Sequence, residues 1–140
     1  MAEGFARAYG ADVLSVQSAG LAPALAVVPL THRVMLEKNI DLGDYYPKEM
    51  QHVDAVVDLV INMSGYDFEA HPGTEVEVWD IRDPIGESDE VFRQVRDEIE
   101  QRVLGLIERT RSRKPAALQG RPVAQAGSSK VDTRRRPTRQ

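Results

Sequence analysis

Few residue types that could do covalent chemistry occur in this chain of 140 residues. It contains no cysteine, so it offers no thiol nucleophile, no disulfide and no thiolate ligand for a metal. The three histidines, His32, His52 and His71, lack the close spacing of a zinc-binding pair, and we predict neither a metal site nor a cofactor. Ser64 and Asp67 have no histidine at a spacing that indicates a hydrolase triad. The sequence therefore excludes cysteine chemistry and gives no support to serine hydrolysis.

The elements that must position any site alternate between helices and strands. Helical spacing of apolar residues predicts four helices, at residues 2–10, 29–38, 48–53 and from 89 onward. β-branched or alternating runs predict three strands, at residues 13–18, 58–63 and 75–81. The alternation predicts an α/β fold with a parallel sheet between helical layers, and three strands are one too few for this length.

The sequence makes two further predictions about these elements: how the first two helices end, and how deeply one strand is buried. Gly10 and Asn39 should end the first two helices with a positive φ. The run VVDLVINMS around residues 58–63 is apolar throughout, which is typical of a strand buried on both faces and central in its sheet.

Charge divides the chain into two parts. Residues 1–110 carry 9 Lys and Arg against 21 Asp and Glu, whereas residues 111–140 carry 9 against 1. We predict one α/β domain over 1–110 and a disordered basic tail over 111–140, because the tail lacks apolar periodicity. The acidic body argues against a duplex-binding face, but the tail could bind nucleic acid or an acidic partner. No apolar run is long enough to span a membrane, and we expect a cytoplasmic protein.

Five segments together resemble the low-molecular-weight protein tyrosine phosphatase family and its relatives, the arsenate reductases. They are MAEGFARAYG, the strand ending in Ser18-Ala19-Gly20, the phrase VMLEKNIDL, the strand DLVINMS and the loop WDIRDPIG before a long helix. They occur in order over roughly residues 1–109. The resemblance implies a three-layer α/β/α fold.

In that family the first strand leads into a phosphate-binding loop with the sequence Cys-x5-Arg followed by Ser or Thr. A helix begins directly after this loop, and its first residues resemble Met1-Ala2-Glu3 of this chain. The resemblance implies that the strand, the nucleophilic cysteine and the phosphate-binding arginine would precede Met1. An N-terminal truncation and a genuine pseudoenzyme are the two explanations we consider. In either case the domain is expected to lack its first strand and to be catalytically silent.

The resemblance assigns roles to four residues of this chain. Asp83 would be the general acid, and Pro84 restricts it to an extended conformation that aims a short carboxylate. Tyr45 and Tyr46 would border the substrate cleft. Ser18 would support the phosphate loop, although a strand-end hydroxyl that bonds local backbone fits equally well.

The implied activity is hydrolysis of phosphomonoesters, with phosphotyrosine on proteins or a small phosphate ester as substrate once the N-terminal loop is present. The arsenate reductase branch needs two further cysteines, and this chain has Met63 and Ala70 at about those positions. An internal disulfide relay is therefore excluded, and a reductase that uses an external thiol is the alternative. A second alternative is a non-catalytic module that binds an anion or a partner protein.

Overall fold

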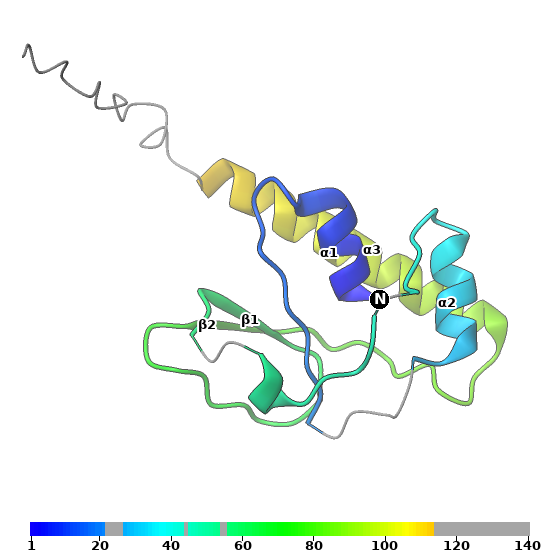
Figure 1. Cartoon of the computed structure of the whole chain (residues 1–140), viewed down its shortest axis with the longest axis horizontal. Coiled ribbons are helices and arrows are strands. Elements are labelled where there is room, and N and C mark those ends of the chain that lie inside the picture. The colour runs from blue at the N-terminus through cyan, green and yellow to red at the C-terminus, as the bar shows by residue number, and fades with distance from the viewer. Residues whose placement is uncertain (22–26, 44, 54–55, 114–140) are drawn as a thin grey trace, which may run out of the picture.

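The computed structural model describes residues 1–21, 27–43, 45–53 and 56–113. Its elements follow in the order α1 (Ala2–Gly10), α2 (Pro29–Leu36), the 3-10 turn η1 (Met50–His52), β1 (Leu59–Asn62), β2 (Glu75–Val78) and α3 (Asp89–Arg113) (Figure 1). The helices predicted at residues 2–10 and from 89 onward are confirmed, as is the strand that begins at Glu75.

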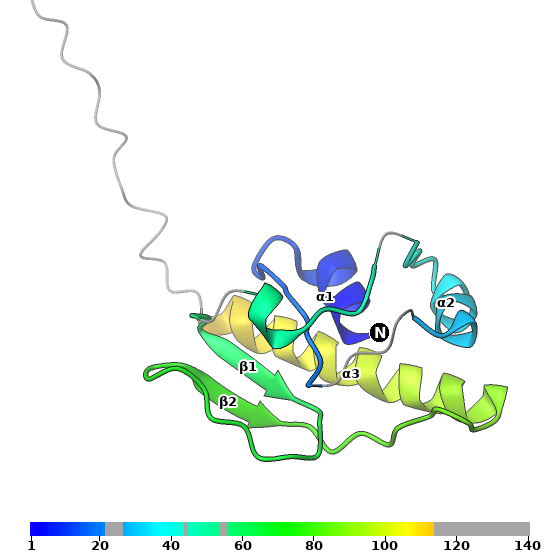
Figure 2. The same cartoon turned by 60° about the horizontal axis from the view of Figure 1, so that its bottom comes forward.

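The two strands pair in parallel, with Leu59 opposite Glu75 and Asn62 opposite Val78. Figure 2 shows both strands pointing toward the side of the molecule where α1 begins. Loops that leave the strands therefore emerge on the same side as the first turn of α1. The predicted α/β class with a parallel sheet is confirmed, and the described residues form a sheet of two strands.

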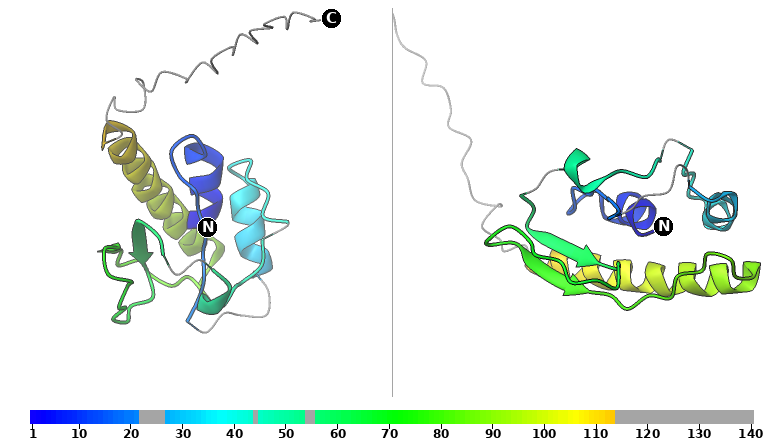
Figure 3. Two further views of the ribbon diagram at one scale, coloured as in Figure 1. Left: turned by 60° about the vertical axis from the view of Figure 1, so that its left-hand side comes forward. Right: turned by 90° about the horizontal axis from the view of Figure 1, so that it is seen from below.

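The core forms where α1 and α2 both pack against the long α3, an arrangement visible in Figure 3. Its centre contains Phe5, Met35, Val103 and Ile107, each at most 2% exposed. Burying side chains of this size contributes about 1.5–3 kcal/mol each. The same cluster includes Trp79, directly after β2, so the sheet is anchored to the helices at its carboxyl end.

The first two helices end for different reasons. Asn39 has a φ of 59°, which confirms the predicted left-handed terminator after α2. The prediction for Gly10 was wrong, because its φ is not positive and the turn continues through Ala11. A Cβ at Gly10 would lie 2.8 Å from Cγ1 of Ile107, so glycine is needed here for the close approach of α1 to α3.

The prediction of a strand at residues 13–18 was wrong. This segment crosses the molecule beyond α1 without joining a ladder, and its nearest pairing is an isolated parallel bridge between Gly20 and Glu49. A β-branched sequence forms a strand only where a neighbouring strand accepts its hydrogen bonds, and none of the described residues does so here. Similarly, β1 is mostly half-buried rather than buried on both faces. The predicted helix at 48–53 is reduced to η1.

The helical body extends to Arg113, three residues beyond the predicted boundary at 110. Arg111 pairs with Asp12 at 2.8 Å and Arg109 with Glu77 at 3.1 Å, which fixes the last turns of α3 to the body. The rest of the predicted tail, residues 114–140, lies outside the described residues. Within the described part of the chain, no helix is long and apolar enough to cross a bilayer.

Candidate functional site

A buried carboxylate joins three segments at the beginning of α1. The side chain of Glu3 is 8% exposed, lies 2.9 Å from the guanidinium of Arg7 and 3.9 Å from Nζ of Lys48, and accepts a hydrogen bond from the hydroxyl of Ser18. We call Glu3, Arg7, Ser18 and Lys48 the Glu3 cluster. It fixes the segment after α1 and the segment before η1 against the first turn of the helix.

The two tyrosines expected at the cleft lie beside this cluster. The guanidinium carbon of Arg7 is 5.9 Å from the ring centroid of Tyr45, and Nζ of Lys48 is 5.1 Å from that of Tyr46. Tyr45 is half-buried and packs against the core, and this burial raises the pKa of its hydroxyl. Tyr46 is 66% exposed. The structure thus gathers Ser18, Tyr45 and Tyr46 around the first turns of α1.

Asp83 occupies the loop that leads from β2 to α3. Its carboxylate is exposed and accepts a hydrogen bond of 3.0 Å from the amide of Ile85, and the amide of Glu87 donates to the carbonyl of Pro84 at 2.9 Å. The side chain is therefore held by its own turn. Within the described part of the chain, no hydrogen bond or ion pair links Asp83 to the Glu3 cluster.

An open groove of about 1810 Å³ separates residues 13–21 from β1. Ala2 and Ala6 of α1, together with Val103 and Leu106 of α3, contribute apolar side chains to it. Glu3 and Ser18 of the Glu3 cluster border the same groove, as do Met63 and Ala70. The groove is thus continuous with the region where the candidate site residues gather.

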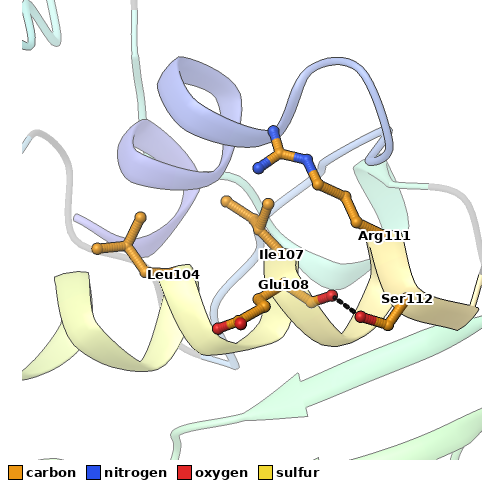
Figure 4. Close-up of a pocket in the computed structure, with 5 residues that line it drawn as sticks. All are labelled: Leu104, Ile107, Glu108, Arg111 and Ser112. Atoms are coloured by element: carbon orange, nitrogen blue, oxygen red, sulfur yellow. Dashed lines mark hydrogen bonds between the residues drawn. The ribbon is translucent and has the colours of Figure 1, made fainter.

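A second, smaller hollow of about 490 Å³ lies on the surface of α3 (Figure 4). Leu104, Ile107, Glu108, Arg111 and Ser112 line it. The hydroxyl of Ser112 donates to the backbone carbonyl of Glu108 at 3.0 Å, and the Arg111 guanidinium is held by Asp12. The polar side chains that line this hollow are therefore hydrogen-bonded, ion-paired or exposed on one face of α3. None of the predicted site residues lines it.

Sequence reasoning found part of this region and missed its centre. Ser18 and the tyrosines were expected at the site, but Glu3, Arg7 and Lys48 received no role. The i, i+4 spacing of Glu3 and Arg7 was a signal for an ion pair on a helix that otherwise buries its apolar face. No group of three potential metal ligands occurs among the residues that the structure describes.

The geometry defines an open α/β domain. Its candidate residues lie on the side where the parallel strands end and a helix begins, which is the usual location of ligand-binding sites in such sheets. Residues 1–116 match the family model described as low molecular weight phosphotyrosine protein phosphatase. The chain belongs to this family.

Several relatives of this chain are named arsenate reductases. The chain is 37% identical to the glutaredoxin arsenate reductase of Synechocystis sp. over 112 residues, which cover 76% of this chain and 85% of the relative. It is 33% identical to arsenate reductase 1 of Bacillus cereus over 108 residues, covering 74% and 80%.

Solved structures give the same result. The chain resembles an arsenate reductase in the phosphate binding state with a TM-score of 0.69 and 34% identity, covering 78% of this chain and 86% of the other. For an arsenate reductase in the reduced state the TM-score is 0.68 and the identity 35%, with 77% and 86% covered.

Proposed function

We propose that this domain serves an arsenate reductase that takes its electrons from external thiols. The observation that supports this most directly is that relatives at 37% and 33% identity are named arsenate reductases, while the residues of this chain supply no cysteine for an internal relay. Met63, directly after β1, and Ala70 border the open groove where the internal relay would need two thiols. One relative is named a glutaredoxin arsenate reductase, and glutaredoxins exchange electrons through thiols and disulfides.

The chemistry explains why external thiols are needed. Reduction of arsenate to arsenite takes two electrons, and two thiols supply them when they join in a disulfide and one arsenate oxygen leaves as water. None of the 140 residues can contribute a thiol. These residues would instead shape the anion site at the beginning of α1, and Asp83 would deliver a proton to the oxygen that leaves. The 140 residues alone should therefore be inactive.

Hydrolysis of phosphomonoesters, including phosphotyrosine, is the second candidate. The family description and the Asp83-Pro84 pair support it, because a general acid on this loop would serve an ester oxygen as well. The two reactions share the oxyanion site and differ in whether electrons are transferred.

The test uses a fusion that places a strand and a Cys-x5-Arg loop ahead of Met1. Incubated with arsenate, glutathione and glutaredoxin, the fusion should release arsenite at a rate that depends on glutaredoxin. The 140-residue chain, treated in the same way, is the blank. Arsenite release that is unchanged when glutaredoxin is left out, or that does not exceed the blank, would contradict the proposal.

A further inference from the structure

The loop that carries Asp83 begins at a buried residue. This loop connects β2 to α3 over residues 79–88 and runs beside α3 toward the start of that helix (Figure 2). Its first residue, Trp79, is 4% exposed and belongs to the core. The amide of Trp79 donates to the carbonyl of Asn62, the last residue of β1, at 3.0 Å. The start of the loop is therefore fixed where it leaves the sheet.

Two arginines of α3 hold the indole ring of Trp79. The guanidinium carbon of Arg102 lies 6.0 Å from the ring centroid, in a cation–π contact. The indole N–H donates to the carboxylate of Glu77 at 2.7 Å, and Arg109 binds the same carboxylate at 3.1 Å. These hydrogen bonds, chiefly the one from Trp79, lower the pKa of the Glu77 carboxyl, so it is ionised at neutral pH. Arg102 and Arg109 lie nearly two helical turns apart and therefore on the same face of α3.

Arg102 also contacts the backbone of the loop. Its Nη2 donates to the carbonyl of Asp80 at 3.4 Å and to the carboxylate of Glu98 at 2.9 Å. Asp83 follows Asp80 within at most about 11 Å of extended chain, so a shift at Asp80 reaches Asp83. The turn at Asp83 is closed by its own hydrogen bonds and moves as a unit. The position of the Asp83 carboxylate therefore depends on how firmly the start of the loop is held.

We propose that Arg102 is a positioning residue for Asp83. By lying over the ring of Trp79 and binding the carbonyl of Asp80, it fixes the place from which Asp83 delivers a proton. The inference rests on the role of general acid that the proposed function gives to Asp83. Arg102 acts through the loop and not on the substrate. Misplacement of a catalytic group by about 1 Å can cost as much as about 10²-fold in rate, so a contact of this kind matters for turnover.

Arg93 provides a matched control on the same helix. Its side chain is 38% exposed, against 37% for Arg102, and it is likewise ion-paired. Its partners are Glu37 at 3.0 Å and Glu90 at 3.9 Å, and both lie outside residues 79–88. A substitution at Arg93 therefore removes the same charge from α3 without removing a contact to the loop that carries Asp83.

The first test uses the full chain and needs no activity. Trp79 is the single tryptophan, so quenching of its fluorescence by acrylamide reports how accessible the ring is. Arg102→Met keeps an unbranched apolar side chain and removes the guanidinium. We expect the quenching constant to rise about twofold and the backbone amide of Trp79 to exchange faster, because the start of the loop opens more often. Arg93→Met should change neither. Unchanged quenching and exchange in Arg102→Met would overturn the inference.

The second test compares two leaving groups in the Cys-x5-Arg fusion. Phenyl phosphate needs a proton on its leaving oxygen more than p-nitrophenyl phosphate does. Arg102→Met should lower kcat/KM about tenfold for phenyl phosphate and less than about twofold for p-nitrophenyl phosphate. Arg102→Lys, whose ammonium can lie over the same ring, should lose less than about threefold with phenyl phosphate. Arg93→Met should leave the ratio of the two substrates unchanged. Equal losses with both substrates in Arg102→Met would indicate a merely structural role and overturn the inference.

A double variant checks that Arg102 acts through Asp83. In the Asp83→Asn fusion, Arg102→Met should not change the ratio of the two substrates further, because the proton donor is already absent. A further tenfold loss with phenyl phosphate would overturn the inference. A fusion that hydrolyses both esters but releases no arsenite would contradict the proposed function and not this inference. If the fusion hydrolyses neither ester, the Trp79 measurements on the full chain decide it.

Discussion

Asp83 is the residue of this chain that the proposed chemistry uses most directly. Its carboxylate is exposed and its turn is closed by the Ile85 amide, a bond that an asparagine oxygen can accept equally well. In the fusion that carries a Cys-x5-Arg loop, Asp83→Asn should therefore leave the loop in place and remove the proton donor. We expect turnover of substrates with poor leaving groups to fall ~10²–10⁴-fold, measured by initial rates.

Asp80 provides the control for this prediction. It lies on the same loop, directly after Trp79, and is also exposed. Asp80→Asn should leave turnover nearly unchanged, and the loss in Asp83→Asn should shrink for a leaving group that needs no proton. If Asp80→Asn reduces turnover more than Asp83→Asn does, the general acid has been assigned to the wrong residue.

Glu3 is the other residue whose substitution is informative. Glu3→Gln keeps the size of the side chain but removes the charge that Arg7 and Lys48 face and weakens the bond from Ser18. We expect a loss of about 1–3 kcal/mol in the free energy of unfolding, measured by urea denaturation. Glu108→Gln, on the exposed side of α3, should change it by less than about 0.5 kcal/mol. Equal losses would show that the Glu3 cluster does not hold the segments together.

Only those site residues that belong to a recognisable sequence motif could be predicted from the sequence. Asp83 was predicted because Asp83-Pro84 lies in a loop that resembles the family's, and Ser18 because it lies two residues before Gly20 at the position where the family supports its phosphate loop. Lys48 could not be found in this way, because its approach to Glu3 depends on how a loop 45 residues further along the chain folds back over α1. Contacts of this kind are properties of the tertiary structure.

Among the elements, α3 contributes most to the core. Ile107 is 1% exposed and packs against α1 near Gly10, whereas Leu104, three residues earlier, is 40% exposed. Ile107→Ala should cost about 2–5 kcal/mol because it removes buried methylenes and leaves a cavity. Leu104→Ala should cost less than about 1 kcal/mol. The comparison of the two by thermal or urea unfolding checks which face of α3 is buried, and similar losses would contradict the packing described here.

The contact between α2 and α3 should make stability depend on pH. Glu37 follows α2 and is bound by Arg93 and then by Arg96 of α3, and these hydrogen bonds lower the pKa of its carboxyl from 4.5 to about 2. A carboxyl with a lowered pKa stabilises the fold fully above its unfolded value and loses this contribution as pH falls through its folded value. The contribution of Glu37 should therefore disappear between about pH 4.5 and 2.

A comparison with Glu37→Gln isolates this effect. The difference in unfolding free energy between the wild type and Glu37→Gln should be constant from pH 7 to 5 and should shrink toward zero near pH 2. Glu90→Gln is the control, because Glu90 is exposed and lies 3.9 Å from Arg93. A difference that stays constant down to pH 2 would show that Glu37 is not held by the two arginines in solution.

Helices and strands differed in how well the sequence predicted them. The helical spacing of apolar residues in α3 is a property of that segment alone and does not depend on contacts elsewhere in the chain. The helix could therefore be predicted from the sequence. Residues 13–18 have the composition of a strand, yet the pairing that makes a strand depends on a neighbour elsewhere in the chain.

Across the whole molecule, net charge differs between the acidic folded body and the basic segment that follows it. Residues 114–140 carry seven Lys and Arg against one Asp and lack apolar periodicity. Deleting them should change the unfolding free energy by less than about 1 kcal/mol, because the described core ends with α3. A larger loss in urea unfolding would show that this segment packs against the body.

We propose that this scaffold serves arsenate reduction rather than phosphoester hydrolysis. The most direct measurement gives one sample of the Cys-x5-Arg fusion two substrates in parallel: arsenate with glutathione and glutaredoxin, and p-nitrophenyl phosphate. We expect release of arsenite that depends on glutaredoxin, at a higher kcat/KM than hydrolysis of the ester. Rapid hydrolysis of p-nitrophenyl phosphate with no arsenite above the level of the 140-residue chain would contradict it.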